Sequence, residues 1–194
     1  MEKRYIFDAD THVSPYCNFD KSINACQWEE RMERAGVAHA IVWLLPQGVV
    51  DVTESNRYIG REAQKNKRMV PFGWANIREG AEKAREDARL CLEEYGCAGV
   101  KLNGAQNEYY IDCPEAMSVM EVVAARNGMI AFHIGADYPD FTDPIRAERA
   151  ARAFPDTKFL MVHMGGAGEP DVSQRVIETA ARNPNCLLYT SDAA

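Results

Sequence analysis

Short apolar stretches alternate with longer amphipathic stretches along the whole chain. The apolar stretches are rich in β-branched and aromatic residues and too short for buried helices, which is typical of strands buried on both faces. The longer stretches have apolar residues at helical spacing and are bounded by glycine or proline. We expect strands at 6–13, 40–45, 69–76, 98–102, 129–134 and 158–164. We expect helices at 24–35, 53–67, 81–95, 114–128, 144–154 and 171–182.

Strand and helix alternate six times with a period of roughly thirty residues, which is the length of one βα unit. This pattern predicts a parallel α/β fold, either a doubly wound open sheet or a (β/α)8 barrel. An open sheet that binds nucleotides usually has a glycine-rich turn after its first strand, whereas the turn at 13–16 reads VSPY. Polar residues gather instead at the carboxyl ends of several strands, where a barrel places its chemistry. We predict a TIM barrel, of which the chain contains about the first six βα units.

The composition of the chain indicates a single globular domain and argues against nucleic acid or a membrane as its partner. The chain has 194 residues, 46% of them hydrophobic, which suits one domain with one core. With 22 basic and 29 acidic residues the formal charge is −7, and no cluster of lysine or arginine favours nucleic acid or an anionic membrane as a partner. No apolar stretch has the length of a leader or a membrane span. We therefore expect a cytoplasmic protein that acts on a small molecule, with its six cysteines reduced.

The first strand has polar residues at alternate positions. Asp8, Asp10 and His12 should share one face of a regular strand. A carboxylate and an imidazole two residues apart can hold one metal ion. The alternative is that the strand ends in polar residues because it reaches solvent.

Three of the four histidines, His12, His133 and His163, lie near the carboxyl ends of expected strands, and only His39 does not. A histidine in an apolar strand must satisfy two ring nitrogens, either by a metal and a second acceptor or by backbone groups. Because three histidines lie at the carboxyl ends of three different strands, a shared metal site is favoured over three separate packing roles. Asp10, His12 and His133 form a plausible ligand set for a divalent ion, first Zn²⁺ and otherwise Mn²⁺ or Fe²⁺.

Other strand-end residues suit the chemistry around such a metal. His163 would act as acid, base or oxyanion donor, or would only pack against the ligands. Lys101 could bridge metals if carbamylated, bind a substrate carboxylate, or pair with an interior acid. Asn103 and Asp137 are candidate substrate-binding residues by position. Trp43 is more typical of the core than of a substrate platform.

Four motifs in this order resemble the amidohydrolase superfamily. They are DADTHV at 8–13, GVKL at 99–102, FHIG at 132–135 and MVHMGG at 161–166. They are most similar to its amidohydrolase-related branch (amidohydrolase 2) of metal-dependent hydrolases and non-oxidative decarboxylases, relatives of aminocarboxymuconate-semialdehyde decarboxylase. The resemblance covers about residues 5 to 185 and implies the (β/α)8 barrel of the metal-dependent hydrolase type.

The resemblance also implies roles for individual residues. His12 matches the second ligand of the first strand, His133 the ligand of the fifth strand and His163 the histidine of the sixth strand that assists chemistry. Asp10 stands where the family usually has the first histidine of a His-x-His motif. Members hydrolyse lactones or amides, decarboxylate or hydrate double bonds, mostly on small carboxylated or aromatic acids.

We therefore expect a metal-dependent hydrolase of a small carboxylated or cyclic substrate. The alternatives are a decarboxylase or lyase on the same scaffold and a non-catalytic α/β ligand-binding module. The sequence does not indicate an assembly, but barrels of this type often pair through helices, so a homodimer is one candidate.

The end of the chain carries a separate expectation. The family places its last metal-associated aspartate at the end of the eighth strand, and a complete barrel needs about 250 residues. Residues 186–194 resemble the translation of a transposase sequencing adapter. We therefore expect a fragment in which residues 1–185 are a partial barrel and 186–194 a non-native tail. The alternative is a native seventh strand. The longer parent would be the enzyme, and this fragment would be inactive.

Overall fold

Seven parallel strands form one sheet in the computed structural model of the chain, which describes residues 5–15, 22–44, 52–134, 138–163 and 169–188. The strands follow one another in chain order, each hydrogen-bonded to the next. Their bounds are β1 Phe7–Val13, β2 His39–Leu44, β3 Met69–Trp74, β4 Gly99–Leu102, β5 Met129–His133, β6 Phe159–Val162 and β7 Cys186–Leu188. The helices are α1 Ala25–Ala35, α2 Thr53–Lys65, α3 Ala81–Glu93, α4 Gly104–Asn107, α5 Pro114–Ala124, α6 Pro144–Ala153 and α7 Pro170–Arg182, with a 3-10 turn at Ile77–Glu79.

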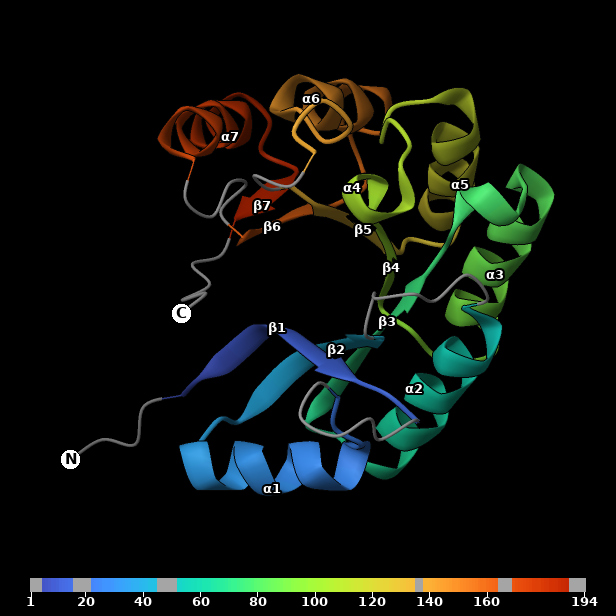
Figure 1. Cartoon of the computed structure of the whole chain (residues 1–194), viewed down its shortest axis with the longest axis vertical. Coiled ribbons are helices and arrows are strands. Elements are labelled where there is room, and N and C mark those ends of the chain that lie inside the picture. Colours follow the sequence, from blue (N-terminus) through green and yellow to red (C-terminus); the bar gives the residue numbers. More distant parts are fainter. Residues whose placement is uncertain (1–4, 16–21, 45–51, 135–137, 164–168, 189–194) are drawn as a thin grey trace.

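The sheet curves from β1 to β7 with the long helices on its outer side (Figure 1). Sequential parallel pairing with outer helices is the arrangement of a TIM barrel, here a partial one, because no pairing between β7 and β1 occurs among the described residues. The predicted parallel α/β barrel is therefore confirmed. Strand β7 lies within 186–194 and pairs with β6 from Phe159 opposite Cys186 to Met161 opposite Leu188.

Several helix ends follow directly from local sequence. Asn24 caps α1 by accepting a hydrogen bond from the Gln27 amide, and Gly36 ends that helix with a φ of 69°, a conformation that glycine adopts without strain. Asp143 caps α6 by accepting from the Ile145 amide, next to a proline at the first turn. These caps and the proline at the start of α5 confirm where the three helices were expected to begin, whereas α5 ends at Ala124, before the expected end at residue 128.

Alternation along the strands divides the apolar residues between two sides of the sheet. On β5, Ile130 and Phe132 belong to the large core beneath the helices, whereas Ala131 belongs to a smaller inner cluster. The buried members of the inner cluster are Ile41, Trp43, Phe72, Ala131, Leu160 and Val162. This apolar layer fills the concave side, so the polar strand ends lie above a packed floor.

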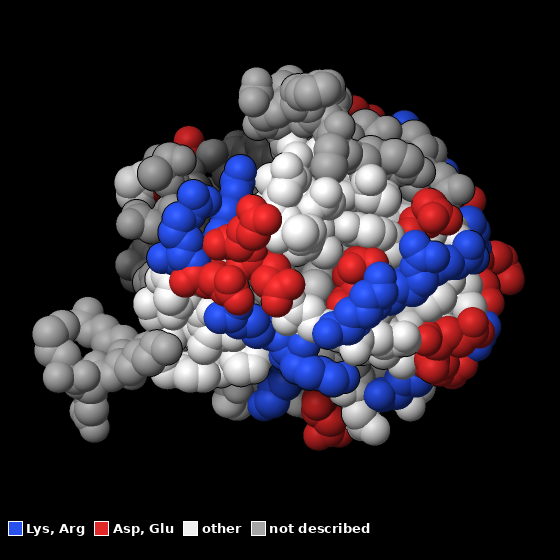
Figure 2. All heavy atoms as spheres, turned by 90° about the horizontal axis from the view of Figure 1, so that it is seen from below, with Lys and Arg blue, Asp and Glu red and all other residues white. Residues whose placement is uncertain are grey.

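The charged side chains lie mostly on the outer helices. On the face that Figure 2 shows, basic and acidic side chains are interleaved. On α3, Arg89 lies 2.7 Å from Glu86 and Lys83 lies 2.6 Å from Asp87. Among the helices in the described part of the chain, none is both long and apolar enough to cross a bilayer.

Candidate active site at the carboxyl ends of the strands

A bulge in β1 determines which of its polar residues face inward. Asp8 pairs with Ala40 and Thr11 pairs with Val42, so β1 has one residue more than β2 between these two pairs. Ala40 and Val42 belong to the core beneath the helices, and paired residues share a face, so Asp8 faces the helices. The prediction that Asp8 shares a face with Asp10 is therefore wrong. The bulge breaks the strict alternation on which that prediction depended, and Asp8 instead accepts a hydrogen bond from the Asp10 amide at 3.1 Å.

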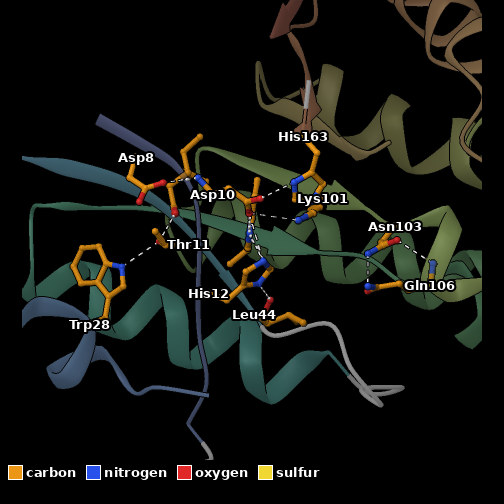
Figure 3. Close-up of polar contacts among 12 residues, drawn as sticks. Asp8, Asp10, Thr11, His12, Trp28, Leu44, Lys101, Asn103, Gln106 and His163 are labelled. Atoms are coloured by element: carbon orange, nitrogen blue, oxygen red, sulfur yellow. Dashed lines mark hydrogen bonds and ion pairs between the residues drawn. The ribbon is translucent and has the colours of Figure 1, made fainter. Parts of the chain in front are cut away.

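The carboxylate of Asp10 is the centre of the polar cluster (Figure 3). Its Oδ1 accepts a hydrogen bond from the indole Nε1 of Trp43 at 2.8 Å. The same oxygen lies 3.4 Å from His12 Nε2 and 3.9 Å from Lys101 Nζ. Its Oδ2 lies 3.5 Å from His163 Nδ1. Strands β1, β2 and β4 and the residue after β6 thus bring five polar side chains together at one edge of the sheet.

The backbone around His12 determines which ring nitrogen carries hydrogen. His12 Nδ1 lies 2.6 Å from the carbonyl oxygen of Leu44. A carbonyl only accepts hydrogen bonds, so Nδ1 carries a hydrogen, and in the neutral ring Nε2 then presents a lone pair. The indole of Trp43 donates to that Nε2 at 3.2 Å. A histidine held in this way by a backbone carbonyl has the arrangement usual for metal-binding imidazoles.

Lys101 lies at the base of the cluster and is only 1% exposed. Its Nζ lies 3.8 Å from the ring centroid of Trp43 and 5.4 Å from that of Trp74. Burial lowers the pKa of Lys101 to about 8, an effect that the negative charge of Asp10 opposes. This ion pair with an interior acid is one of the three roles that the sequence left open for Lys101.

His163 follows β6 and does not lie inside it, as the expected strand at 158–164 would require. Its φ is +61°, a left-handed conformation that is costly for residues other than glycine and is often found at functional sites. Its ring lies 4.9 Å from that of His133 between centroids. Burial lowers the pKa of His163, and the negative charge of Asp10, which acts in the opposite direction, does not offset this effect. His163 is therefore mostly a neutral imidazole at pH 7, which can accept a proton.

The donor atoms present suit a divalent metal. Two ligands about 2.1 Å from a tetrahedral metal lie about 3.4 Å apart, and Asp10 Oδ1 and His12 Nε2 are 3.4 Å apart. Both atoms present lone pairs, and one carboxylate with imidazoles is a common ligand set. Within the described ranges, no three histidine, cysteine, aspartate or glutamate side chains are placed together to hold a metal. The ligand set of Asp10, His12 and His133 therefore stays a prediction.

Two further predicted residues lie away from this cluster or outside the described ranges. Asn103 is fully buried, and its Oδ1 caps α4 by accepting from the Gln106 amide at 3.0 Å. Its Nδ2 donates to Gln106 Oε1 at 2.8 Å. Its amide thus supports the short helix that follows β4, and contact with substrate stays a prediction. Asp137 lies outside the described residues.

The sequence interpretation missed the polar role of Trp43. Trp43 belongs to the inner apolar cluster, as expected, but its indole N–H also bonds the two central acceptors, Asp10 and His12. Its position could have indicated this role, because Trp43 is the penultimate residue of β2. It therefore lies at the carboxyl ends of the strands, as the site histidines do.

A curved sequential parallel sheet with histidines and a carboxylate at its strand ends defines an enzyme-like barrel scaffold. A family model described as amidohydrolase matches residues 19–192, and the chain belongs to this family. No curated protein matches the sequence.

Solved structures share the fold at low sequence identity. A probable 2-pyrone-4,6-dicarboxylic acid hydrolase from Acinetobacter baumannii has 13% identity and a TM-score of 0.66, covering 97% of this chain and 71% of its own. The 5-carboxyvanillate decarboxylase LigW from Sphingomonas paucimobilis has 16% identity and a TM-score of 0.69, with coverages of 97% and 81%. A 5-carboxyvanillate decarboxylase from Novosphingobium aromaticivorans with bound manganese has 12% identity and a TM-score of 0.69, with coverages of 84% and 67%.

Proposed function

We propose that the protein is a metal-dependent hydrolase of a small carboxylated or cyclic substrate, such as a lactone or an amide. The observation that carries this proposal is the convergence of Asp10, His12, Lys101 and His163 at the carboxyl ends of the strands. In a barrel this edge is where catalytic groups lie. Membership of the amidohydrolase family supports an enzyme on this scaffold.

Asp10, His12 and His133 would hold the metal, with Zn²⁺ as the first choice and Mn²⁺ or Fe²⁺ as alternatives. When bound, such an ion lowers the pKa of a coordinated water and polarises a carbonyl oxygen. The hydrogen bond from His12 to Leu44 supports this assignment because it directs the Nε2 lone pair toward Asp10. The structural neighbour that contains manganese supports a divalent ion in this family.

His163 would move the proton in the reaction. Its side chain is 22% exposed and lies beside the Asp10 carboxylate, so it can contact a small molecule above the strands. Because its pKa is lowered by burial, the neutral ring can accept a proton from water at pH 7 and later donate it to a leaving group.

Two buried polar residues of β4 and the turn after it would support the site. Lys101 and Asn103 are almost fully buried, so we propose that they support the substrate-binding site from within the fold. Lys101 balances the charge of Asp10, and Asn103 fixes the backbone after β4. A contact of Asp137 with substrate is part of the same proposal.

Decarboxylation is the second candidate, because two of the solved structures with this fold are 5-carboxyvanillate decarboxylases. Product analysis separates the two reactions. The hydrolase predicts a ring-opened or cleaved acid without release of CO2 from the Zn²⁺- or Mn²⁺-loaded protein. CO2 as the product would replace the proposed reaction with the second candidate. Ligand binding without any turnover would favour a non-catalytic binding module.

In an active form of the protein, replacing His163 by alanine should lower kcat by about 10²- to 10⁴-fold, the usual contribution of a general acid or base. The bound metal should remain, because His163 is not among the proposed ligands. The measurement is steady-state kinetics with metal analysis of the same sample. His39→Ala is the control, since His39 begins β2 at the opposite edge of the sheet and contacts Tyr5. Equal rates for both variants would remove His163 from the mechanism.

A further inference from the structure

The indole of Trp43 joins the two side chains proposed as metal ligands from β1. Its Nε1 lies 2.8 Å from Asp10 Oδ1 and 3.2 Å from His12 Nε2. The two acceptor atoms are 3.4 Å apart. An indole N–H only donates, so its position between them requires that both atoms present lone pairs toward the same point.

Packing fixes the direction of this N–H. Trp43 is fully buried, and the edge of Phe72 meets its ring at an interplanar angle of 89° and a centroid distance of 5.8 Å. The ammonium of Lys101 lies over the ring at 3.8 Å. An aromatic ring held by an edge contact and a cation on its face has little freedom to turn.

We propose that Trp43 is a positioning residue that holds Asp10 and His12 in the geometry for metal binding. This inference rests on the proposed function and names a residue outside the ligand set. The N–H orients the carboxylate of Asp10 through Oδ1, the oxygen that also lies 3.9 Å from the Lys101 ammonium. A bound metal would take the His12 lone pair, and the N–H would then donate to Asp10 alone, already its shorter contact.

The other tryptophans of the chain are matched controls. The sequence contains three tryptophans, and each indole N–H donates to a protein acceptor. Trp28 donates to Thr11 Oγ1 at 3.1 Å, on the same strand β1 but away from the carboxylate. Trp74 donates to Asn107 Oδ1 at 3.4 Å and also faces Lys101. Both are 2% exposed or less, like Trp43.

The first test measures Mn²⁺ binding by calorimetry and by the EPR signal of free Mn²⁺. Trp43→Phe keeps an aromatic ring and removes the N–H, and it should weaken Mn²⁺ binding about 10- to 100-fold, as loss of a group that orients a ligand does. Trp74→Phe and Trp28→Phe should stay within about twofold of wild type, because neither N–H contacts a proposed ligand. Equal weakening by Trp43→Phe and Trp74→Phe would overturn the proposal.

A second test does not depend on metal binding or on the folding of Trp43→Phe. In ¹H–¹⁵N spectra with chelator present, Asp10→Asn should move the indole resonance of Trp43 and leave that of Trp74 in place. An unmoved Trp43 resonance would overturn the positioning role. If wild type binds neither Mn²⁺ nor Zn²⁺, the proposed metal-dependent function fails, and this spectrum alone decides whether Trp43 positions the pair.

Discussion

At the residue scale, the site buries a positive charge beside a negative one. The ammonium of Lys101 lies 3.9 Å from Asp10 and packs against the ring of Trp43. Burial lowers its pKa to about 8, so desolvation outweighs the attraction of Asp10. The burial of Lys101 therefore lowers the free energy of unfolding at neutral pH. Its position beside Asp10 indicates that it balances the negative charge of that carboxylate.

The pH dependence of unfolding tests this cost. Between pH 8 and about 10.4, the ordinary lysine pKa, Lys101 is mostly neutral in the folded protein and protonated in the unfolded chain. Unfolding therefore takes up a proton in this window, so raising the pH disfavours unfolding and stabilises the folded state. The free energy of unfolding of wild type should therefore rise relative to Lys101→Met, by a few kcal/mol at most.

The measurement is urea denaturation at several pH values with chelator present. Lys65→Met is the control, because Lys65 is 68% exposed beside Glu62. Its difference from wild type should stay constant across the window. A constant difference for Lys101→Met as well would contradict the lowered pKa.

At the element scale, the parts of the fold that were predictable depend on near neighbours in sequence. Asn24, Gly36 and the Asp143–Pro144 pair each bound a helix by local chemistry. The bulge in β1 was not predictable, because it depends on pairing with β2. The bulge leaves Asp10 directed inward although Asp8 is not. The sequence therefore predicted that polar residues gather at this end of the strands, but not which of the β1 residues point inward.

Helices α6 and α7 are joined by a buried carboxylate. Glu148 on α6 lies 2.9 Å from Arg182 on α7 and 2.6 Å from Arg152, and its side chain is 4% exposed. The hydrogen bond from Arg182 is the largest cause of the lowered pKa of Glu148. A lowered carboxyl pKa stabilises the fold above the unfolded value of about 4.3. This contribution is lost as the pH falls through the folded pKa.

Glu148→Gln should cost about 1–3 kcal/mol at pH 7, since charge-assisted hydrogen bonds are lost in a buried position. At a pH below the folded pKa, the difference from wild type should largely disappear. Urea denaturation at both pH values measures this. The control Glu178→Gln removes an exposed partner 3.8 Å from Arg182 and should cost under about 0.5 kcal/mol. If the loss of unfolding free energy in Glu148→Gln did not change with pH, the lowered pKa of Glu148 would be contradicted.

At the scale of the whole molecule, the sheet has two outer strands. Among the described residues, β1 pairs only with β2, and β7 pairs only with β6. Phe7 on β1 is 45% exposed and Leu187 on β7 is 39% exposed. Unpaired strand edges with apolar side chains promote association with another chain.

The protein should therefore associate as its concentration rises, and Phe7→Lys should suppress this, because a charge on an edge strand blocks pairing. Light scattering during size-exclusion chromatography at two concentrations measures the effect. Ile177→Lys changes a similarly exposed residue on α7 and should leave association unchanged. Dissociation by Ile177→Lys alone would instead support a homodimer that pairs through its helices.

The central claim is that the Asp10 cluster binds one divalent metal, and metal stoichiometry tests it most directly. Calorimetric titration of the chelator-treated protein with Zn²⁺ and Mn²⁺ should give about one ion per chain, as for a mononuclear site. Asp10→Asn, His12→Ala and His133→Ala should each weaken that binding strongly. His39→Ala should bind as wild type does. Binding lost equally in His39→Ala, or absent from wild type, would contradict the proposed metal centre.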